Sequence, residues 1–435
     1  MSDASGSTIG DFFELVPGYA FKSSSFTDNG IPVIKIKNVK AGYFSDHEFS
    51  YVPPSFLTSR PEKLAKPGDL LVSMSGNRHD GSPETWVGKI AFFDRCSRFF
   101  INQRVGALRQ RVGADVDQRY AAFALSSLDY QNLFISIATS SGGQANLSPH
   151  QILSTAFTPP RLSEQRAIAQ ILGALDDKVE LNRKMSATLE AIARALFKSW
   201  FVDFDPVRAK AEGRDPGLPA EIAALFPDSF ENSELGDIPT GWGTGCVDDE
   251  FELTMGQSPP GNTYNADGNG LPFYQGRRDF GVRFPVRRIY CSAPARRART
   301  GDTLVSVRAP VGDINTAVEA CAIGRGVAAA RHKSGSRSYT YQFMRSLKDV
   351  FGRFEAEGTV FGSMGKKDFH EIACIIPPNA PVLALERLVS AIDARVEANE
   401  FESRTLTAIR DALLPKLISG EIRITDAERI AERSA

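Results

Sequence analysis

The residue types that most often carry out chemistry form no complete catalytic motif in this sequence. An amino-methyltransferase acting on DNA needs Asn, Asp or Ser, then Pro-Pro, then an aromatic residue for the flipped base. The two candidates, Ser258-Pro-Pro-Gly261 and Thr158-Pro-Pro-Arg161, lack the aromatic residue. The stretch Gly358–Lys366 has the wrong spacing for a phosphate-binding loop, and no serine stands in a Gly-x-Ser-x-Gly elbow. The sequence therefore predicts a chain that is not an enzyme.

The usual metal-binding side chains are few and scattered. No Cys-x-x-Cys and no His-x-x-x-His occurs, so we expect no metal, no cofactor and no disulfide framework. The cysteines are predicted to be buried free thiols. The residues concerned are His47, His79, His150, His332 and His370, with Cys96, Cys246, Cys291, Cys321 and Cys374.

Side chains with paired donors or acceptors can instead read the edges of DNA bases. Arg and Lys suit guanine, and Asn and Gln suit adenine, whereas phosphate contacts position a protein without reading sequence. In the first half of the chain such residues stand beside expected turns and strand ends. The DNA-binding candidates there are Lys35, Lys37, Asn38, Ser75, Asn77, Arg78, Gln103, Arg104, Gln144 and Asn146.

The second half of the chain has a strongly basic stretch. Between Arg277 and Arg308 the local excess is about seven positive charges, which is enough for a phosphate-binding face. For any single residue, plain solvated surface remains an open alternative. The candidates in this half are Gln275, Arg277, Arg278, Arg308, Arg325, Lys366 and Lys367.

These candidates are positioned by elements that occur twice in the chain. Phe13-Glu-Leu15 resembles Phe251-Glu-Leu253, and Gly68-Asp-Leu-Leu-Val-Ser73 resembles Gly301-Asp-Thr-Leu-Val-Ser306. In each copy Gly-Asp predicts a turn, and the apolar run after it predicts a buried strand. Strictly alternating strand and helix units are absent, so a doubly wound parallel sheet is not expected.

The clearest repeat is a long helix. At an offset of 217 residues, which takes Asn182 to Asn399, about a dozen identities fall in roughly 34 aligned positions. Apolar residues at steps of three and four predict one helical seam in each copy. The first seam is Ile168, Ile171, Leu175, Met185, Leu189, Ile192 and Leu196, and the second is Leu385, Leu388, Ile392, Leu406, Ile409 and Leu413.

Polar residues interrupt both seams at matching places. Lys178 and Arg395 occupy one seam position and the two asparagines the next, and such residues can fix the register of paired helices. Each helix is expected to run about 35 residues, or roughly 50 Å. Ser163 is a candidate N-cap for the first helix. Pro415 is expected to kink or end the second helix, and Gly420 to stop it.

Four aromatic residues cluster near the end of the first long helix. We predict a partner-binding surface there, with core packing as the open alternative. They are Phe197, Trp200, Phe201 and Phe204.

Composition sets the outer bounds. With 435 residues, 42% hydrophobic and 24% charged, the chain has the composition of an ordinary globular protein of two or three domains. No apolar run is long enough for a membrane helix and the N-terminus lacks a signal peptide core, so we expect a cytoplasmic protein. The net charge of −1 counts mildly against nucleic acid, but the charge is unevenly distributed.

The fold expected from these patterns is α+β, with two similar mixed domains, two long antiparallel coiled-coil helices and a pseudo-two-fold internal repeat. Duplex DNA also has local two-fold axes, so two related domains can read half-sites at a fixed distance. Divergent domains would read different half-sites. The expected boundaries are residues 1–160 and 244–380 for the domains, 161–202 and 381–420 for the helices, 203–243 for a linker and 421–435 for a tail.

The sequence resembles the DNA-specificity subunits of Type I restriction-modification enzymes over nearly its whole length. The resemblance rests on Ser163-Glu-Gln-Arg166 leading into Ile168–Asp177, on Leu196–Pro206, on Gly236–Trp242 and on Leu413–Gly420. The second helix departs from the pattern, because Leu385-Glu-Arg387 stands where Glu-Gln is expected.

This resemblance implies two target-recognition domains, which bind double-stranded DNA at a split, asymmetric sequence. It also implies partners, namely two modification subunits that carry the methyltransferase and further motor-nuclease subunits, with no chemistry in this chain itself. Two alternatives remain open. One is a stand-alone restriction-methylation enzyme, which would need a cofactor or metal motif, and the other is a coiled-coil scaffold that reads no DNA.

Overall fold

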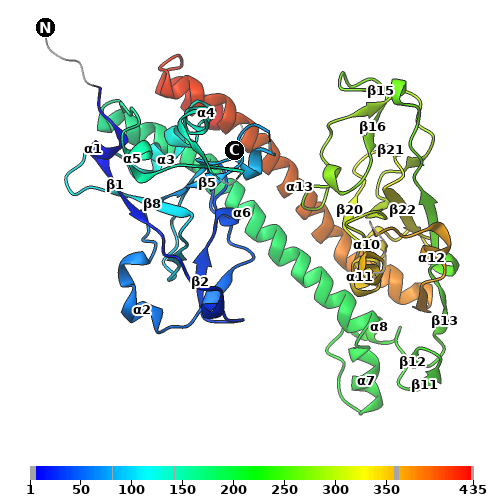
Figure 1. Cartoon of the computed structure of the whole chain (residues 1–435). Helices are drawn as coiled ribbons and strands as arrows, with labels where there is room; N and C mark the ends of the chain where they lie inside the picture. The colour runs from blue at the N-terminus through cyan, green and yellow to red at the C-terminus, as the bar shows by residue number, and fades with distance from the viewer. Residues whose placement is uncertain (1–5, 81, 142, 357–361, 433–435) are drawn as a thin grey trace, which may run out of the picture. The chain divides into compact units, whose positions relative to one another are not determined.

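The computed structural model of the chain describes residues 6–80, 82–141, 143–356 and 362–432. The chain divides into two compact units (Figure 1), the first formed by residues 1–181 with 402–435 and the second by residues 182–401. Among the described residues, no helix is both long and apolar enough to cross a membrane.

The first unit is built on a four-stranded antiparallel sheet with two smaller sheets beside it. The strand order of the main sheet is β1 (Phe13–Pro17), β8 (Val105–Gln110), β4 (Leu70–Ser73), β6 (Ile90–Phe92). The smaller sheets have the orders β3 (Ser50–Val52), β2 (Ile31–Ile34), β7 (Phe100–Ile101) and β5 (Ser75–Gly76), β10 (Gln144–Asn146), β9 (Thr139–Ser141). The helices are α1 (Ile9–Phe12), α2 (Phe56–Ser59), α3 (Gln118–Leu125), α4 (Leu128–Ile137), α5 (Pro149–Leu153) and α14 (Ile424–Glu432).

The second unit repeats this arrangement. Its main sheet has the order β14 (Phe251–Met255), β22 (Val327–His332), β19 (Thr303–Ser306), β20 (Ile314–Thr316). A second sheet has the order β15 (Tyr264–Asn265), β17 (Tyr290–Cys291), β16 (Leu271–Tyr274), β21 (Cys321–Ile323), β18 (Arg297–Ala298). β13 (Gly243–Cys246) pairs with β23 (Ala373–Ile376). The helices are α9 (Val247–Glu250), α10 (Arg337–Ser346), α11 (Lys348–Ala356) and α12 (Lys366–His370).

The repeat is confirmed by this topology. The predicted pair Phe13-Glu-Leu15 and Phe251-Glu-Leu253 opens the edge strands β1 and β14, which face β8 and β22 in the same antiparallel sense. In both units one strand of the smaller sheet runs parallel to its neighbour, β2 to β7 and β16 to β21.

The structure gives a physical reason for the repeated Gly-Asp turn. Gly68 and Gly301 have φ of +94° and +85°, a left-handed conformation that favours glycine. Asp69 then accepts the backbone N–H of Lys66 at 2.8 Å and pairs with Arg109 of the adjacent strand at 2.7 Å.

Asp302 makes the same two contacts in the second unit. It accepts the backbone N–H of Arg299 at 2.6 Å and the Nε–H of Arg331 at 2.8 Å. The repeated serine also has one role, because Ser73 and Ser306 accept backbone N–H groups from Lys89 and Asp313 across the sheet. The copied residues are therefore those that build the turn and fasten the central strands.

The two long helices are α6 (Leu162–Phe201) and α13 (Asn379–Ile418), and each contributes residues to both units. In the first unit Asp176 pairs with Arg410 at 2.6 Å and Lys178 with Glu402 at 3.3 Å. Residue numbers rise on one helix while they fall on the other, so the helices pack antiparallel there, as predicted.

The second unit holds the other ends of the same two helices. The Asn399 side chain amide donates to the Ser186 hydroxyl at 3.2 Å, and Ala193 and Phe197 share one apolar cluster with Leu385 and Val389. The order of these contacts is again antiparallel. Asn182 and Asn399 are buried, which confirms the predicted polar interruption of the seam.

The expected seam is wrong at several positions. Val179 and Val396 are buried, whereas Arg395 is exposed and Lys178 is half-buried with its ammonium paired to Glu402. Ile192 and Leu388 are 45% and 42% exposed. An α-helix has 3.6 residues per turn, whereas steps of three and four average 3.5. The buried face therefore rotates slowly away from the expected seam positions and onto adjacent residues.

The helix ends also differ from expectation. Helix α6 begins at Leu162, so Ser163 is inside it, and Glu164 accepts the N–H of Arg161 at 3.3 Å instead. Pro415 does not end α13, which continues to Ile418. Gly420 does follow the last turn, with φ of +73°, as predicted.

The segment between α6 and β13 folds against the second unit. It contains α7 (Asp205–Ala211), α8 (Ala220–Ala223) and the hairpin of β11 (Phe230–Ser233) with β12 (Gly236–Pro239). Val207, Phe226 and Trp242 belong to the apolar core of that unit, so much of the expected linker is ordered structure.

Candidate nucleic-acid interface

A basic groove of about 950 Å³ lies in the second unit, and five of the seven sequence-predicted residues of that half line it. Gln275 directly follows β16, Arg308 lies two residues beyond β19 and Arg325 lies two residues before β22. The adjacent ends of these strands bring residues far apart in sequence to one place. The five residues are Gln275, Arg277, Arg278, Arg308 and Arg325.

The arginine side chains of the groove are exposed and make few contacts with the rest of the protein. Arg277 contacts Asp313 at 2.7 Å, and Arg325 donates to the Ser258 hydroxyl at 3.2 Å. Asp279 is buried at the floor, where it accepts the backbone N–H of Gln275 at 2.7 Å and pairs with Arg288. The contacts of Asp279 thus fix the turn at Arg277–Asp279. The guanidinium groups of this turn face solvent and can contact phosphates or base edges.

Among the groove residues that were not sequence candidates, Arg288 and Ser258 have side chains that could contact DNA. Arg288 belongs to the basic stretch, so its charge was a usable signal, but nothing in the sequence placed it beside Arg277. Ser258 lies in the Ser-Pro-Pro-Gly stretch and enters the groove from another loop. Lys366 and Lys367 begin α12, just after residues 362–364, which run beside the Val307–Ala309 segment. Both lysines are exposed.

The matching strand ends of the first unit gather four predicted residues. The Ser75 hydroxyl donates to the Asn146 side chain at 2.6 Å, and Arg104 donates to Gln144 at 2.9 Å. The backbone carbonyl of Arg104 also accepts the N–H of Met74 on the adjacent strand. This end of β4 and β8 therefore presents hydroxyl and amide groups with one arginine, whereas the second unit presents mostly arginine.

Lys35, Lys37 and Gln103 lie at the neighbouring end of the smaller sheet. Lys35 follows β2, donates to the Ser50 hydroxyl at 2.7 Å and lies 4.3 Å from the Phe26 ring centroid. Burial, and secondarily the charge of Lys37, lowers the pKa of Lys35. Lys37 pairs with Glu48 at 3.1 Å, and Gln103 has an exposed side chain.

Three other predicted residues are engaged inside the first unit. Asn38 is 1% exposed and accepts the N–H of Lys35 at 2.9 Å. Asn77 donates to the Thr85 hydroxyl at 3.0 Å. Arg78 donates to the Ile135 and Ala138 carbonyls and so fastens the end of α4. The Asn38 amide also donates to the Ser45 and His47 carbonyls, so all three side chains have donors engaged within the protein.

The four aromatic residues predicted to bind a partner are buried in the second unit. Trp200 packs edge-on against Phe226, and Phe201 lies 5.1 Å from the Tyr339 ring. Phe197 and Phe201 also line an apolar pocket of about 220 Å³. This burial supports the core interpretation for most of their surface. The exposed fractions of Phe197, Trp200, Phe201 and Phe204 are 4%, 1%, 8% and 5%.

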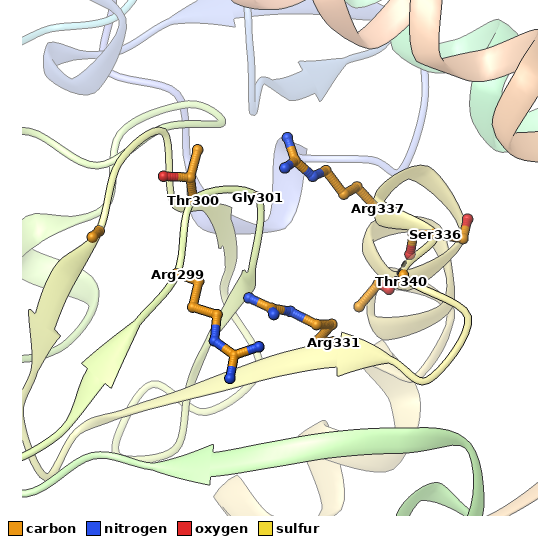
Figure 2. Close-up of a pocket in the computed structure, with 9 residues that line it drawn as sticks. Arg299, Thr300, Gly301, Arg331, Ser336, Arg337 and Thr340 are labelled. Carbon is orange, nitrogen blue, oxygen red and sulfur yellow. Dashed lines mark hydrogen bonds between the residues drawn. The ribbon is translucent and has the colours of Figure 1, made fainter.

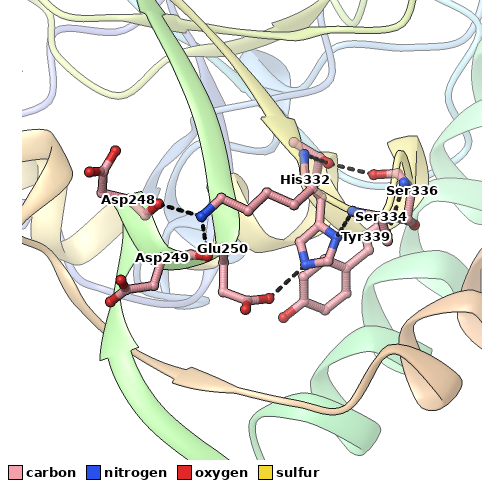
Figure 3. Close-up of polar contacts among 9 residues, drawn as sticks. Asp248, Asp249, Glu250, His332, Ser334, Ser336 and Tyr339 are labelled. Atoms are coloured by element: carbon pink, nitrogen blue, oxygen red, sulfur yellow. Dashed lines mark hydrogen bonds and ion pairs between the residues drawn. The ribbon is translucent and has the colours of Figure 1, made fainter.

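A serine, a histidine and a carboxylate are linked in the second unit (Figure 3), an order found in catalytic triads. His332 contacts Glu250 at 2.7 Å through Nε2 and Ser334 at 2.7 Å through Nδ1. His332 is 2% exposed, and Lys333 beside it donates to the Asp249 carbonyl at 2.5 Å. These contacts fasten the turn after β22 to α9, and the buried imidazole offers no face to a substrate.

Other side chains that could do chemistry are the usual metal ligands and the five cysteine thiols, three of which are buried. Within the described ranges, no group of three or more His, Cys, Asp or Glu residues could hold a metal ion. Burial raises the pKa of the Cys321 and Cys374 thiols to about 12, and Cys291 is buried as well. The prediction of buried thiols is wrong for Cys96, which is exposed, and for Cys246, which is half-buried.

Comparison with known proteins gives consistent matches along the chain. Residues 1–191 match the family described as Type I restriction modification DNA specificity domain. A relative from Methanocaldococcus jannaschii, described as a type I restriction enzyme specificity subunit, is 27% identical over 403 residues and covers 91% of this chain and 88% of its own length.

A second relative and one solved structure extend the match. The type I restriction enzyme HindI specificity subunit of Haemophilus influenzae is 24% identical, covering 97% of this chain and 100% of its own length. The crystal structure of a Type-I restriction-modification system S subunit from M. genitalium superposes with a TM-score of 0.58 at 16% identity, covering 95% and 96% of the two chains, and so shares the fold. Over nearly its whole length the chain is therefore similar to type I restriction enzyme specificity subunits, and its residues 1–191 match their DNA specificity domain.

Proposed function

We propose that this chain reads a split, asymmetric DNA sequence, with one half-site contacted by each unit. The observation that carries the proposal is the groove of the second unit, which is lined by Gln275 and five arginines. Arg suits guanine and phosphate, and Gln suits adenine. The matching strand ends of the first unit carry Ser75, Gln144 and Asn146, so the two units would prefer different bases.

In this proposal α6 and α13 act as the spacer between half-sites. Each has 40 residues, which corresponds to roughly 60 Å of helix. The buried Asn182 and Asn399 favour a single register of the pair, because a slipped register would leave their amides against apolar side chains.

The same proposal includes docking of two methyltransferase subunits and of motor-nuclease subunits, in the cytoplasm. Within the predicted partner surface, the apolar pocket lined by Phe197 and Phe201 is the place where a partner side chain could bind. A scaffold that reads no DNA would have no use for five exposed arginines in one groove, so we prefer the DNA reader.

The test is to express the chain with its modification subunits in a host that lacks restriction systems and to sequence the methylome. We expect a modified sequence made of two different half-sites separated by a fixed gap. Omitting only this chain should abolish that modification. Methylation of the same sites without the chain would refute the proposal.

A further inference from the structure

A second basic cavity lies at the other end of the central strands from the groove. It has a volume of about 400 Å³ and is lined by Arg299 from the turn before β19, Arg331 from the end of β22 and Arg337 from the start of α10. Figure 2 shows these three side chains around one space, beside Thr300 and Gly301. Strands β19 and β22 run between the two sites, a separation of roughly 15 Å.

The charges of this cavity do not cancel. Arg331 donates to Asp302 at 2.8 Å, so one of the three arginines is neutralised. Arg299 and Arg337 are exposed, and among the described residues no carboxylate lies within ion-pair distance of either guanidinium. The residues that line the cavity therefore carry a local excess of two positive charges, and Arg337 also borders a second pocket that contains the carboxylates of Glu386, Asp393 and Glu397.

The first unit has a cavity at the equivalent place. It measures about 290 Å³ and is lined by Lys66, Arg109, Arg111 and Asp69. Arg109 is neutralised by Asp69, so the exposed Lys66 and Arg111 give the lining the same excess of two charges. Arg111 also donates to the Gly10 carbonyl at 2.8 Å and interacts with the Asp11 carboxylate. Lys66 occupies the position of Arg299, and Gln118 lies over Gly68 as Arg337 lies over Gly301. The residue types have changed between the two copies, but the local charge has not.

We infer that each unit binds a dianionic phosphoryl group in this cavity, at a site separate from the DNA groove. Guanidinium groups donate pairs of hydrogen bonds that match phosphate oxygens. An excess of two charges matches a phosphate monoester or free phosphate better than a phosphodiester of the DNA backbone, which carries one charge. The ligand class is therefore a small phosphate compound, and the inference does not depend on DNA reading.

The experiment is a calorimetric titration of the full chain with inorganic phosphate at constant ionic strength. We expect saturable binding of two equivalents. Arg299→Gln with Arg337→Gln should weaken one of the two sites by about tenfold or more, because two charge-assisted contacts are lost. Adding Lys66→Gln and Arg111→Gln should remove the other. All four side chains are exposed, so the fold should persist, and thermal melting checks this.

The matched control is Arg296→Gln with Arg297→Gln, which removes two equally exposed charges outside the cavity and should leave both sites intact. Unsaturable uptake of phosphate, or equal weakening by the control pair, would overturn the inference. A final titration adds short duplex DNA. If the duplex competes with phosphate, the cavity belongs to the DNA-binding face and a separate site is refuted. If both bind together, the separate site is supported.

Discussion

Arg277 and Arg278 are the residues of the groove that most directly test DNA binding. Both are exposed on a turn whose position is fixed by the buried Asp279. Removing their side chains therefore subtracts two positive charges without removing a structural contact of the core. The Arg277 contact to Asp313 is exposed and contributes little to stability.

We predict that Arg277→Ala with Arg278→Ala weakens DNA binding by the assembled complex and lowers the slope of log affinity against log salt by about two. Binding isotherms at several salt concentrations measure both. Arg299→Ala with Arg337→Ala is the matched control, since it removes two exposed arginines at the other end of the strands. An unchanged slope in the first variant would exclude this turn from the interface.

At the same scale, the sequence predicted some site residues better than others. Arg277, Arg278 and Arg308 were found because a local excess of positive charge is visible along that part of the chain. The engagement of Arg78 was not predictable, since its carbonyl partners on Ile135 and Ala138 lie 57 and 60 residues away. Asn38 was chosen for its side chain type, yet it forms a turn with Lys35, as Asp279 does with Gln275.

Among the elements, the loop that leads from the groove turn to β17 is held to both long helices by one residue. Arg283 is 3% exposed, contacts Asp393 of α13 at 2.6 Å and Glu190 of α6 at 3.8 Å, and lies 4.0 Å from the Tyr341 ring centroid. Asp393 is identical in the two copies of the helix repeat. The equivalent residue of the first copy, Asp176, pairs with Arg410 in the first unit. The repeated aspartate thus anchors an arginine in each unit.

We predict that Arg283→Ala destabilises the second unit by about 3 kcal/mol, because it leaves two partly buried carboxylates with fewer partners. Hydrogen exchange of peptides from residues 244–401 should report the loss, with the first unit unaffected. The control is Arg119→Ala, measured in peptides of the first unit, which removes a pair with the more exposed Asp177 and should cost about 1 kcal/mol or less. Equal losses for both variants would contradict the anchoring role.

The existence of the two long helices was predictable because the repeat and the spacing of apolar residues agree. Their details were not. Which of Ile192 and Ala193 is buried depends on how the helix faces the rest of its unit, and the sequence pattern alone does not contain that rotation. Pro415 is tolerated near the end of α13, where the fewest turns of helix remain to be disrupted.

In the molecule as a whole, the two units are expected to act as separate modules. The main sheets of the two units share one strand order, and the shared residues build turns and fasten strands, while the residues at the strand ends differ. The bases that are recognised should therefore depend on which unit is present, and the gap between half-sites should depend on the two long helices.

The most direct measurement is methylome sequencing of cells that express, with the partner subunits, a chimera in which residues 1–160 come from a relative with another target. We predict that one half of the modified sequence changes while the other half and the gap are kept. A chimera that changes both halves, or that modifies the original sequence unaltered, would contradict this prediction.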